Sequence, residues 1–264
     1  MQWWLAYLAI GSAVGFFAGL LGIGGGAVMV PMLVWVFTAQ GLPEEHIMHL
    51  SLGTSMSTIM FTSISSMRAH HAHDAVDWRI ARAMAPGILT GSFLAALAAG
   101  LIATRPLAVM FTVLVFYAAT QILFDLRPKH TRELPGPAGT FAAGAGIGAL
   151  SSLLAAGGAF MVIPFLAWCS VPLRRAIGTA AAVGLPIAIA GTAGYILQGL
   201  RVAGLPPATL GYVYLPALAL VVIMSMLAAP LGARVAHRVP VRRLRIVFAL
   251  VLYALAARML AGLW

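Results

Sequence analysis

Two stretches decide the fold of this chain: Gly15-FFAGLLGIGGGAVMV-Pro31 and Gly148-ALSSLLAAGGAFMVI-Pro164. They align without a gap, and the matched residues include Gly11 with Gly144, Gly15 with Gly148, Gly24 with Gly157, Gly25 with Gly158, Pro31 with Pro164 and Trp35 with Trp168. A glycine-broken apolar segment at corresponding places in two halves of a chain points to the binding site of a transporter. We therefore expect the functional site at these two stretches.

The composition indicates a membrane protein. The 264 residues are 62% hydrophobic and 8% charged, and the mean hydropathy is +0.99. A soluble domain of this size would have too apolar a surface. Successive apolar stretches have about the 17–25 residues that a bilayer core requires, and they are continuous rather than alternating. We predict an all-α, multi-pass protein of the plasma membrane, in bacteria the inner membrane.

Ten helical segments are expected from the apolar stretches. They are Trp3–Leu21, Ala27–Thr38, Leu50–Met67, Ile80–Ile102, Leu107–Phe124, Gly139–Leu154, Phe160–Ser170, Ile177–Leu197, Leu210–Leu231 and Leu244–Leu263. The second and seventh are short, rising only about 16–18 Å at 1.5 Å per residue. Each should therefore pair with the segment before it as a hairpin whose glycine turn lies inside the membrane. The helical bundle would consist of two repeats, 1–128 and 139–264, joined by a cytoplasmic linker, 129–138.

Basic residues predict that the two repeats are inverted relative to each other. If each hairpin enters and leaves on one side, each repeat has three further crossings, and 13 basic residues face the cytoplasm against 3 outside. The cytoplasmic set is Arg68, Arg79, Arg82, Arg127, Lys129, Arg132, Arg174, Arg175, Arg234, Arg238, Arg242, Arg243 and Arg245, and the outer set is Arg105, Arg201 and Arg258. If each glycine segment crosses once instead, the count is 8 against 8, so the positive-inside rule favours inversion. This topology also explains the formal charge of +10 without a nucleic-acid partner.

The candidate substrate site comprises the glycine turns and the hydroxyls near them. Its residues are Gly24, Gly25, Gly26, Gly157, Gly158, Thr54, Ser55, Thr179, Ser151 and Ser152. Backbone amides freed at such turns need a partner inside a membrane, and the helices that follow point their positive N-terminal ends at the turns. Thr54 and Thr179 stand in matching Gly-Thr pairs of the two halves.

Packing is the alternative explanation for these residues. Glycines allow helices to approach closely, which is the better explanation for Gly11, Gly15 and Gly19, and hydroxyls can bond within or between helices. No charged residue falls in the middle of an apolar segment. A proton relay or cation site built on a buried carboxylate is therefore not expected, and the site favours an anion.

A histidine-rich loop follows the hydroxyl-rich third segment. Arg68, His70 and His71 are candidates for gating or for collecting substrate, and a metal site at His70, His71 and His73 is a less favoured alternative. The single Cys169 forms no intrachain disulfide, and we expect neither a cofactor nor enzymatic activity.

Nearly the whole chain resembles the sulfite exporter TauE/SafE family of membrane permeases. The resemblance rests on the Gly19–Pro31 segment, on Gly53-Thr54-Ser55, on the loop His70-HAHDAVD-Trp78 and on the stretch Ala229–Arg245. The family usually has glycine where Asp74 stands. The resemblance implies transport of sulfite, sulfonates or related organosulfur anions.

The expected function is a secondary transporter of a small anion, an exporter of sulfite or another organosulfur anion, that works by alternating access. A proton could be co-transported, and a homodimer is left open. A passive anion channel is the main alternative, and a metal permease or a membrane assembly or sensor protein are further ones.

Overall fold

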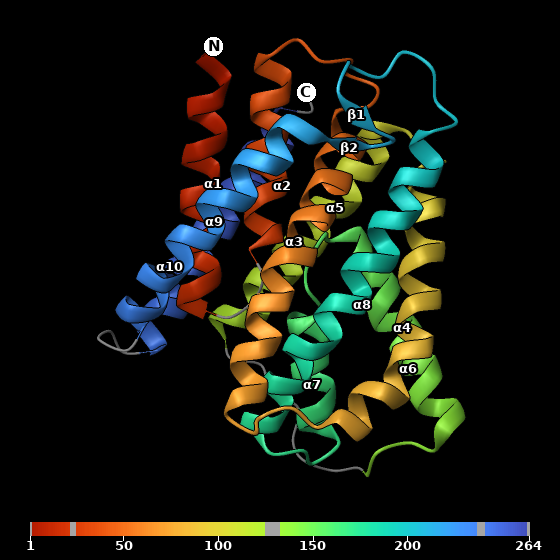
Figure 1. Ribbon diagram of the computed structural model, residues 1–264, viewed down its shortest axis with the longest axis vertical. Helices are drawn as coiled ribbons and strands as arrows, with labels where there is room; N and C mark the ends of the chain where they lie inside the picture. The colour runs from red at the N-terminus through yellow and green to blue at the C-terminus, as the bar shows by residue number, and fades with distance from the viewer. Residues whose placement is uncertain (1, 22–24, 125–132, 237–240, 263–264) are drawn as a thin grey trace.

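The computed structural model describes residues 2–21, 25–124, 133–236 and 241–262. These residues form ten helices and one hairpin of two short strands (Figure 1). The helices are α1 (Gln2–Leu21), α2 (Gly26–Ala39), α3 (Ile47–Ala72), α4 (Trp78–Ala99), α5 (Thr104–Leu123), α6 (Pro137–Leu153), α7 (Ala159–Trp168), α8 (Leu173–Gly199), α9 (Leu215–Ala236) and α10 (Val241–Ala261). Each predicted segment overlaps one of these helices, and the all-α membrane architecture is confirmed.

Four described helices are long and apolar enough to cross a membrane: α4, α5, α8 and residues Leu215–Gly232 of α9. α1, α2, α7 and α10 contain shorter apolar stretches. α3 is long but carries many hydroxyls and histidines, which lower its hydropathy. It is instead enclosed by protein, because every residue from Ile47 to Ile59 is buried.

The two glycine stretches join helices that turn back inside the bundle. α1 begins at the end of the molecule that holds both chain termini, and α2 returns to that end (Figure 1). α6 begins at the opposite end, and α7 returns there (Figure 1). We call these pairs the first hairpin (α1 and α2) and the second hairpin (α6 and α7).

The bundle is centred on α3 and α8, which pack against each other. Around them, α1 packs along α9, α6 packs along α4, and α5 packs along α10. Each of these pairs joins a helix of the first half of the chain to a helix of the second half. The two halves therefore form one interlocked body rather than two separate domains.

Small residues make the close contacts of these pairs. A Cβ added to Gly15 would lie 2.3 Å from the carbonyl oxygen of Ser225, and one added to Gly19 would lie 2.0 Å from that of Ala229. A Cβ on Gly148, the match of Gly15, would lie 2.5 Å from the carbonyl oxygen of Ile88. The packing role predicted for Gly11, Gly15 and Gly19 is thus confirmed.

One predicted segment began too early. The stretch predicted as helix from Leu210 starts as the hairpin of β1 (Thr209–Leu210) and β2 (Val213–Tyr214), and α9 begins only at Leu215. Gly211 in the turn has φ +56°, a left-handed conformation that ends a helical path. Strands of two residues carry no alternation, so the sequence could not signal them.

Candidate functional site: two buried glycine turns

The turn of the second hairpin presents a row of backbone amides for which the described part of the chain holds no acceptor. Gly158 has φ +80° and is the N-cap residue of α7, where the amides of Met161 and Val162 donate to its carbonyl. The amides of residues 157–160 have no acceptor among the described residues, although all four residues are buried. Such groups need a partner in a membrane interior, and four adjacent donors suit an anion.

The start of α2, in the first hairpin, has the same backbone form as the start of α7. Gly25, the match of Gly158, has φ +53° and is the N-cap residue of α2, and its carbonyl accepts from the amides of Val28 and Met29. The left-handed conformation explains why glycine occupies both positions. Gly24 lies outside the described residues.

The two turns touch each other. A Cβ on Gly26 would lie 1.7 Å from the carbonyl oxygen of Ala155 in the second turn, so only glycine allows this approach. Ile59 of α3 lies beside both turns, within 2.9 Å of a Cβ on Gly26 and 3.6 Å of one on Gly157. Among the described residues, no other atom comes within 4 Å of that position on Gly157, so the described part of the turn leaves room for a small group there.

Hydroxyls of α6 add donors near the second turn. The Ser151 hydroxyl lies 3.8 Å from a Cβ position on Gly158. The hydroxyls of Ser152 and Ser55 are fully buried, and neither has a hydrogen-bond partner among the described residues. Ser152 and Met56 of α3 flank Gly191, where a Cβ would lie 2.9 Å from Ser152 Oγ and 2.2 Å from Met56 Cε.

The two repeated threonines have partners instead. Thr54 Oγ1 accepts from the amide of Tyr214 at 3.0 Å, and Thr179 Oγ1 accepts from the amide of Asp77 at 3.0 Å. The neighbouring Ser57 and Thr58 donate to carbonyls one turn earlier in α3. Some hydroxyls of α3 therefore have hydrogen-bond partners among the described residues and others do not, and the residue types alone could not predict which.

The basic and histidine candidates lie far along α3 from the turns. Arg68 is exposed and nine residues beyond Ile59, about 13 Å along a helix. His71 Nδ1 accepts from Trp78 Nε1 at 3.2 Å and packs edge-on against its ring, whereas His70 is half-buried. No group of three His, Cys, Asp or Glu residues suited to a metal occurs in the described part of the chain.

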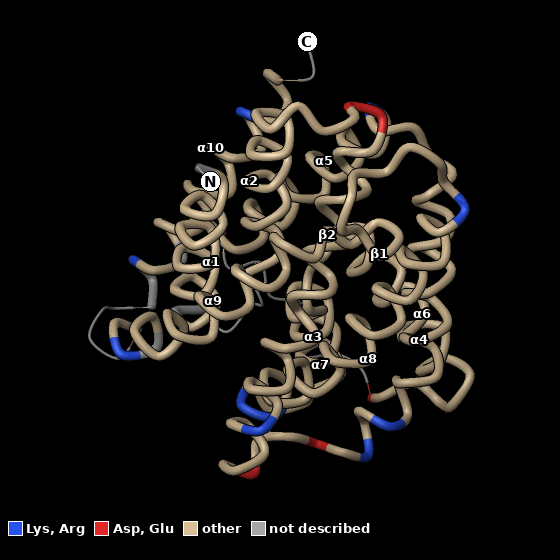
Figure 2. The backbone as a smooth tube through the Cα atoms, turned by 45° about the horizontal axis from the view of Figure 1, so that its top comes forward, with Lys and Arg blue, Asp and Glu red and all other residues tan. Residues whose placement is uncertain are grey.

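Basic residues gather at the end of the molecule opposite the termini (Figure 2). The α3–α4 loop and the start of α8 meet there, because Arg174 donates to the carbonyl of His73 at 2.7 Å. The turns are lined by backbone, hydroxyls and apolar side chains, and no described charged residue is a nearest neighbour of a Cβ position at Gly25, Gly26, Gly157 or Gly158. The turn region is therefore polar without a fixed charge.

Three residues near the turns were not predicted. Gly184 of α8 approaches the second turn, since a Cβ there would lie 2.9 Å from the Gly157 carbonyl oxygen and 3.1 Å from Ser63 Oγ. Ile187 lies 2.4 Å from a Cβ position on Gly158. Ser63 belonged to the hydroxyl-rich stretch already noted, but Gly184 and Ile187 have no repeat partner or motif that could have marked them.

The comparisons with known proteins agree with this architecture. The sulfite exporter TauE/SafE family matches residues 7–259. The chain belongs to this family. It is 35% identical over 256 residues to a "probable membrane transporter protein" of Haemophilus influenzae, covering 97% of each chain. It is also 24% identical over 268 residues to a protein of the same description from Methanocaldococcus jannaschii, covering 96% of this chain and 94% of the relative.

A Bacillus subtilis protein named probable membrane transporter protein YdhB is 27% identical over 194 residues, covering 70% of this chain and 76% of the relative. No solved structure matches the chain. The family and these relatives indicate a membrane transporter of a small-molecule substrate. They place this TauE/SafE member in the bacterial plasma membrane as a multi-pass protein.

Proposed function

We propose that this TauE/SafE member carries a small oxyanion, sulfite or another organosulfur anion, across the plasma membrane by alternating access, as an exporter. The family description supplies the substrate class. The observation that carries the proposal is the row of buried amides at residues 157–160, for which the described residues provide no acceptor. Ser151 and Ser152 would complete the donor set from the end of α6.

The electrostatics of the turns favour a monovalent anion. A helix N-terminus contributes about half a unit of positive charge, so α2 and α7 together offer about one. A dianion in this site would keep one uncompensated charge in a low-dielectric interior, at a large cost in free energy. We therefore expect hydrogen sulfite to be preferred over sulfite, or sulfite to enter together with a proton.

The matching contacts of the two halves support alternating access by a pair of repeats. α1 packs along α9 while α6 packs along α4, and these contacts exchange under the correspondence of α1 with α6 and of α4 with α9. Gly11 and Gly15 face α9 as their matches Gly144 and Gly148 face α4. Rocking of one repeat against the other could then expose the central turns to each side in turn.

A passive anion channel is the second candidate, because hydroxyls and amides alone also line anion pores. The two functions differ in counterflow: a carrier exchanges labelled for unlabelled substrate faster than it moves substrate in one direction, whereas a channel shows no such acceleration. A metal permease would instead require that binding fail when His70, His71 and His73 are replaced.

The deciding experiment is flux of an anion panel in proteoliposomes of the purified protein. The panel comprises sulfite, sulfate, thiosulfate, a sulfonate, formate and chloride. Saturable, counterflow-competent flux of sulfite or a sulfonate supports the proposal, and unsaturable flux that follows size alone supports the channel. Absence of flux for every anion, with the protein correctly folded, would support an assembly or sensor protein.

A further inference from the structure

The repeated Gly-Thr pairs each hold a loop of the opposite half of the chain. Thr54 of α3 accepts from the amide of Tyr214, in the segment between α8 and α9, at 3.0 Å. Thr179 of α8 accepts from the amide of Asp77, in the segment between α3 and α4, at 3.0 Å. We call these the α3 latch (Gly53, Thr54 and segment 212–214) and the α8 latch (Gly178, Thr179 and segment 75–77).

The glycine of each pair makes room for the same loop. A Cβ on Gly53 would lie 2.4 Å from the carbonyl oxygen of Tyr212, and a Cβ on Gly178 would lie 2.2 Å from that of Ala75. In both latches a loop carbonyl lies directly against the glycine, and the amide two residues later in the loop donates a hydrogen bond to the threonine. Two such matched contacts, on matched residues, indicate one device used twice.

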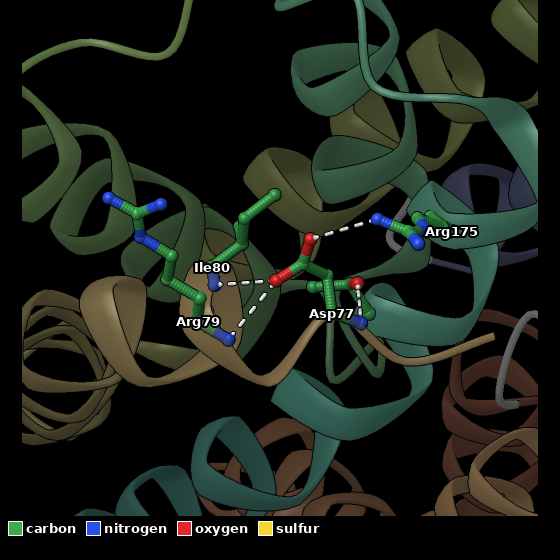
Figure 3. A network of polar contacts seen from close by, with 5 residues as sticks. Asp77, Arg79, Ile80 and Arg175 are labelled. Atoms are coloured by element: carbon green, nitrogen blue, oxygen red, sulfur yellow. Dashed lines mark hydrogen bonds and ion pairs between the residues drawn. The ribbon is translucent and has the colours of Figure 1, made fainter. Parts of the chain in front are cut away.

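The α8 latch has charged support. The Asp77 carboxylate accepts from the amides of Arg79 and Ile80 at 3.1 and 3.2 Å, which caps α4, and its other oxygen lies 3.8 Å from Arg175 (Figure 3). Asp74 in the same loop has φ +52°. This left-handed conformation is uncommon for residues other than glycine, and Asp is one of the residues that tolerate it.

The α3 latch has aromatic support. The Tyr212 ring stacks on His49 at 4.8 Å, and its amide donates to the carbonyl of Tyr195 at 3.3 Å. The Tyr214 ring packs edge-on against Phe37 of α2 at 5.5 Å. Burial, and next the Glu45 carboxylate, raise the pKa of the Tyr212 phenol, so it stays uncharged. The two latches thus share the Gly-Thr contact and differ in everything around it.

We propose that Thr54 and Thr179 are positioning residues that close the central site from its two ends. The α3 latch lies at the end that holds the chain termini and the α8 latch at the opposite end (Figure 1). Both latches are formed in this structure. Opening toward one end breaks the latch at that end and leaves the other intact. This inference rests on the proposed alternating access and adds the residues that control it.

Each latch is weak enough to break and re-form during transport. A neutral hydrogen bond contributes a modest net stabilisation, and an exposed ion pair such as Arg175 with Asp77 contributes little. Either latch can therefore break during a transport cycle. Losing one should shift the balance between the two open states rather than unfold the protein.

The test measures access to the central turn from each face. Gly157→Cys serves as the reporter in a Cys169→Ser background, because Ile59 is the one described residue within 4 Å of a Cβ at Gly157. Sealed vesicles of known orientation receive a membrane-impermeant thiol reagent on one face at a time. The variants are Thr54→Val and Thr179→Val, with Thr54→Ser and Thr179→Ser as matched controls that keep the hydroxyl.

We expect Thr54→Val to raise labelling from the face with the termini about fivefold relative to the other face. Thr179→Val should raise labelling from the opposite face by about the same factor. A change of about fivefold corresponds to the net contribution of one hydrogen bond. The serine variants should label like the parent. Equal changes on both faces, no change in either valine variant, or serine variants that behave like valine would overturn the proposal. If the reporter reacts from neither face, the KM of each single variant measured from each face gives the same test, with KM lowered only at the freed end.

The labelling needs no substrate, so it separates this inference from the proposed function. Opposite shifts without flux of any panel anion would retain the latches and overturn the anion transporter. Sulfite flux without opposite shifts would retain the transporter and overturn the latches. A direct role of both threonines in holding the anion predicts a third pattern, weaker affinity from both faces in both valine variants.

Discussion

Ser152 is the residue whose chemistry is least explained by folding alone. Its hydroxyl is fully buried and has no hydrogen-bond partner among the described residues, whereas Ser57 and Thr58 bond back to their own helix. An unpaired buried hydroxyl destabilises a protein, so its retention near the second turn is consistent with a ligand that pairs with it.

We therefore expect Ser152→Ala to leave thermal stability unchanged or slightly higher, and to weaken anion binding by roughly 1–3 kcal/mol. Ser92→Ala is the matched control, because the Ser92 hydroxyl is equally buried and unpaired but lies against Gly148, away from the turns. Titration of purified protein with sulfite in a thermal-shift assay compares the two. Equal affinity in both variants would remove Ser152 from the site.

The residue scale is also where sequence reasoning is weakest. The left-handed conformations at Gly25 and Gly158 were predictable, since paired glycines at matched positions of a turn indicate them. The roles of Thr54 and Thr179 were not, because their partners lie 160 and 102 residues away in the chain. A hydroxyl beside a predicted site looks the same in sequence whether it faces a ligand or a loop amide.

At the scale of elements, the contact between the two hairpins should be intolerant of any side chain. Gly26→Ala places its methyl against the backbone of Ala155, which cannot move aside as a flexible side chain would. We expect a loss of about 1–3 kcal/mol in stability, the usual cost of overpacking. Gly146→Ala in α6 is the control, since none of the described residues has an atom within 4 Å of a Cβ at that position. Thermal unfolding in detergent measures both, and equal melting temperatures would contradict the contact.

The helices themselves were largely predictable, because apolar runs of membrane length bounded by Gly, Pro and charged residues are strong signals. The two short helices α2 and α7 could be predicted because each is a short apolar stretch that directly follows a glycine turn. What failed was the start of α9, where two-residue strands precede the helix. The packing partners of α1 and α6 could not be predicted, because small residues indicate a close contact without naming the other helix.

The orientation of the elements gives a second test. Gly41, Gly136 and Gly204 all lie in loops, and no atom of the described residues comes within 4 Å of a Cβ position there, so cysteine reporters should not disturb packing. Impermeant thiol reagents added outside whole cells should label reporters at Gly41 and Gly204 but not at Gly136. Labelling of Gly136 from outside would contradict the inverted topology and the basic-residue count behind it.

At the scale of the whole molecule, the turns provide donors but no fixed cation, so transport should depend on the charge of the substrate. Lowering pH through the range in which sulfite becomes hydrogen sulfite should raise flux at fixed total concentration, because the monoanion matches the roughly one unit of helix-end charge. A sulfonate, whose charge is constant over that range, is the control and should show little change. Flux that follows the dianion would mean that a basic residue neutralises the substrate, with Arg68 the first to examine.

The central claim, that the second glycine turn binds the anion, is tested most directly at Gly157. Of the described residues, a methyl group there meets Ile59 alone, at an ordinary contact distance of 3.6 Å, but it would occupy the space beside the amides of residues 157–160. The measurement is sulfite flux in proteoliposomes of Gly157→Ala and Gly146→Ala, each with a melting temperature within a few degrees of the parent. We predict that flux is lost in Gly157→Ala and retained in Gly146→Ala. Normal flux in both variants would contradict the claim and leave these glycines a role in packing alone.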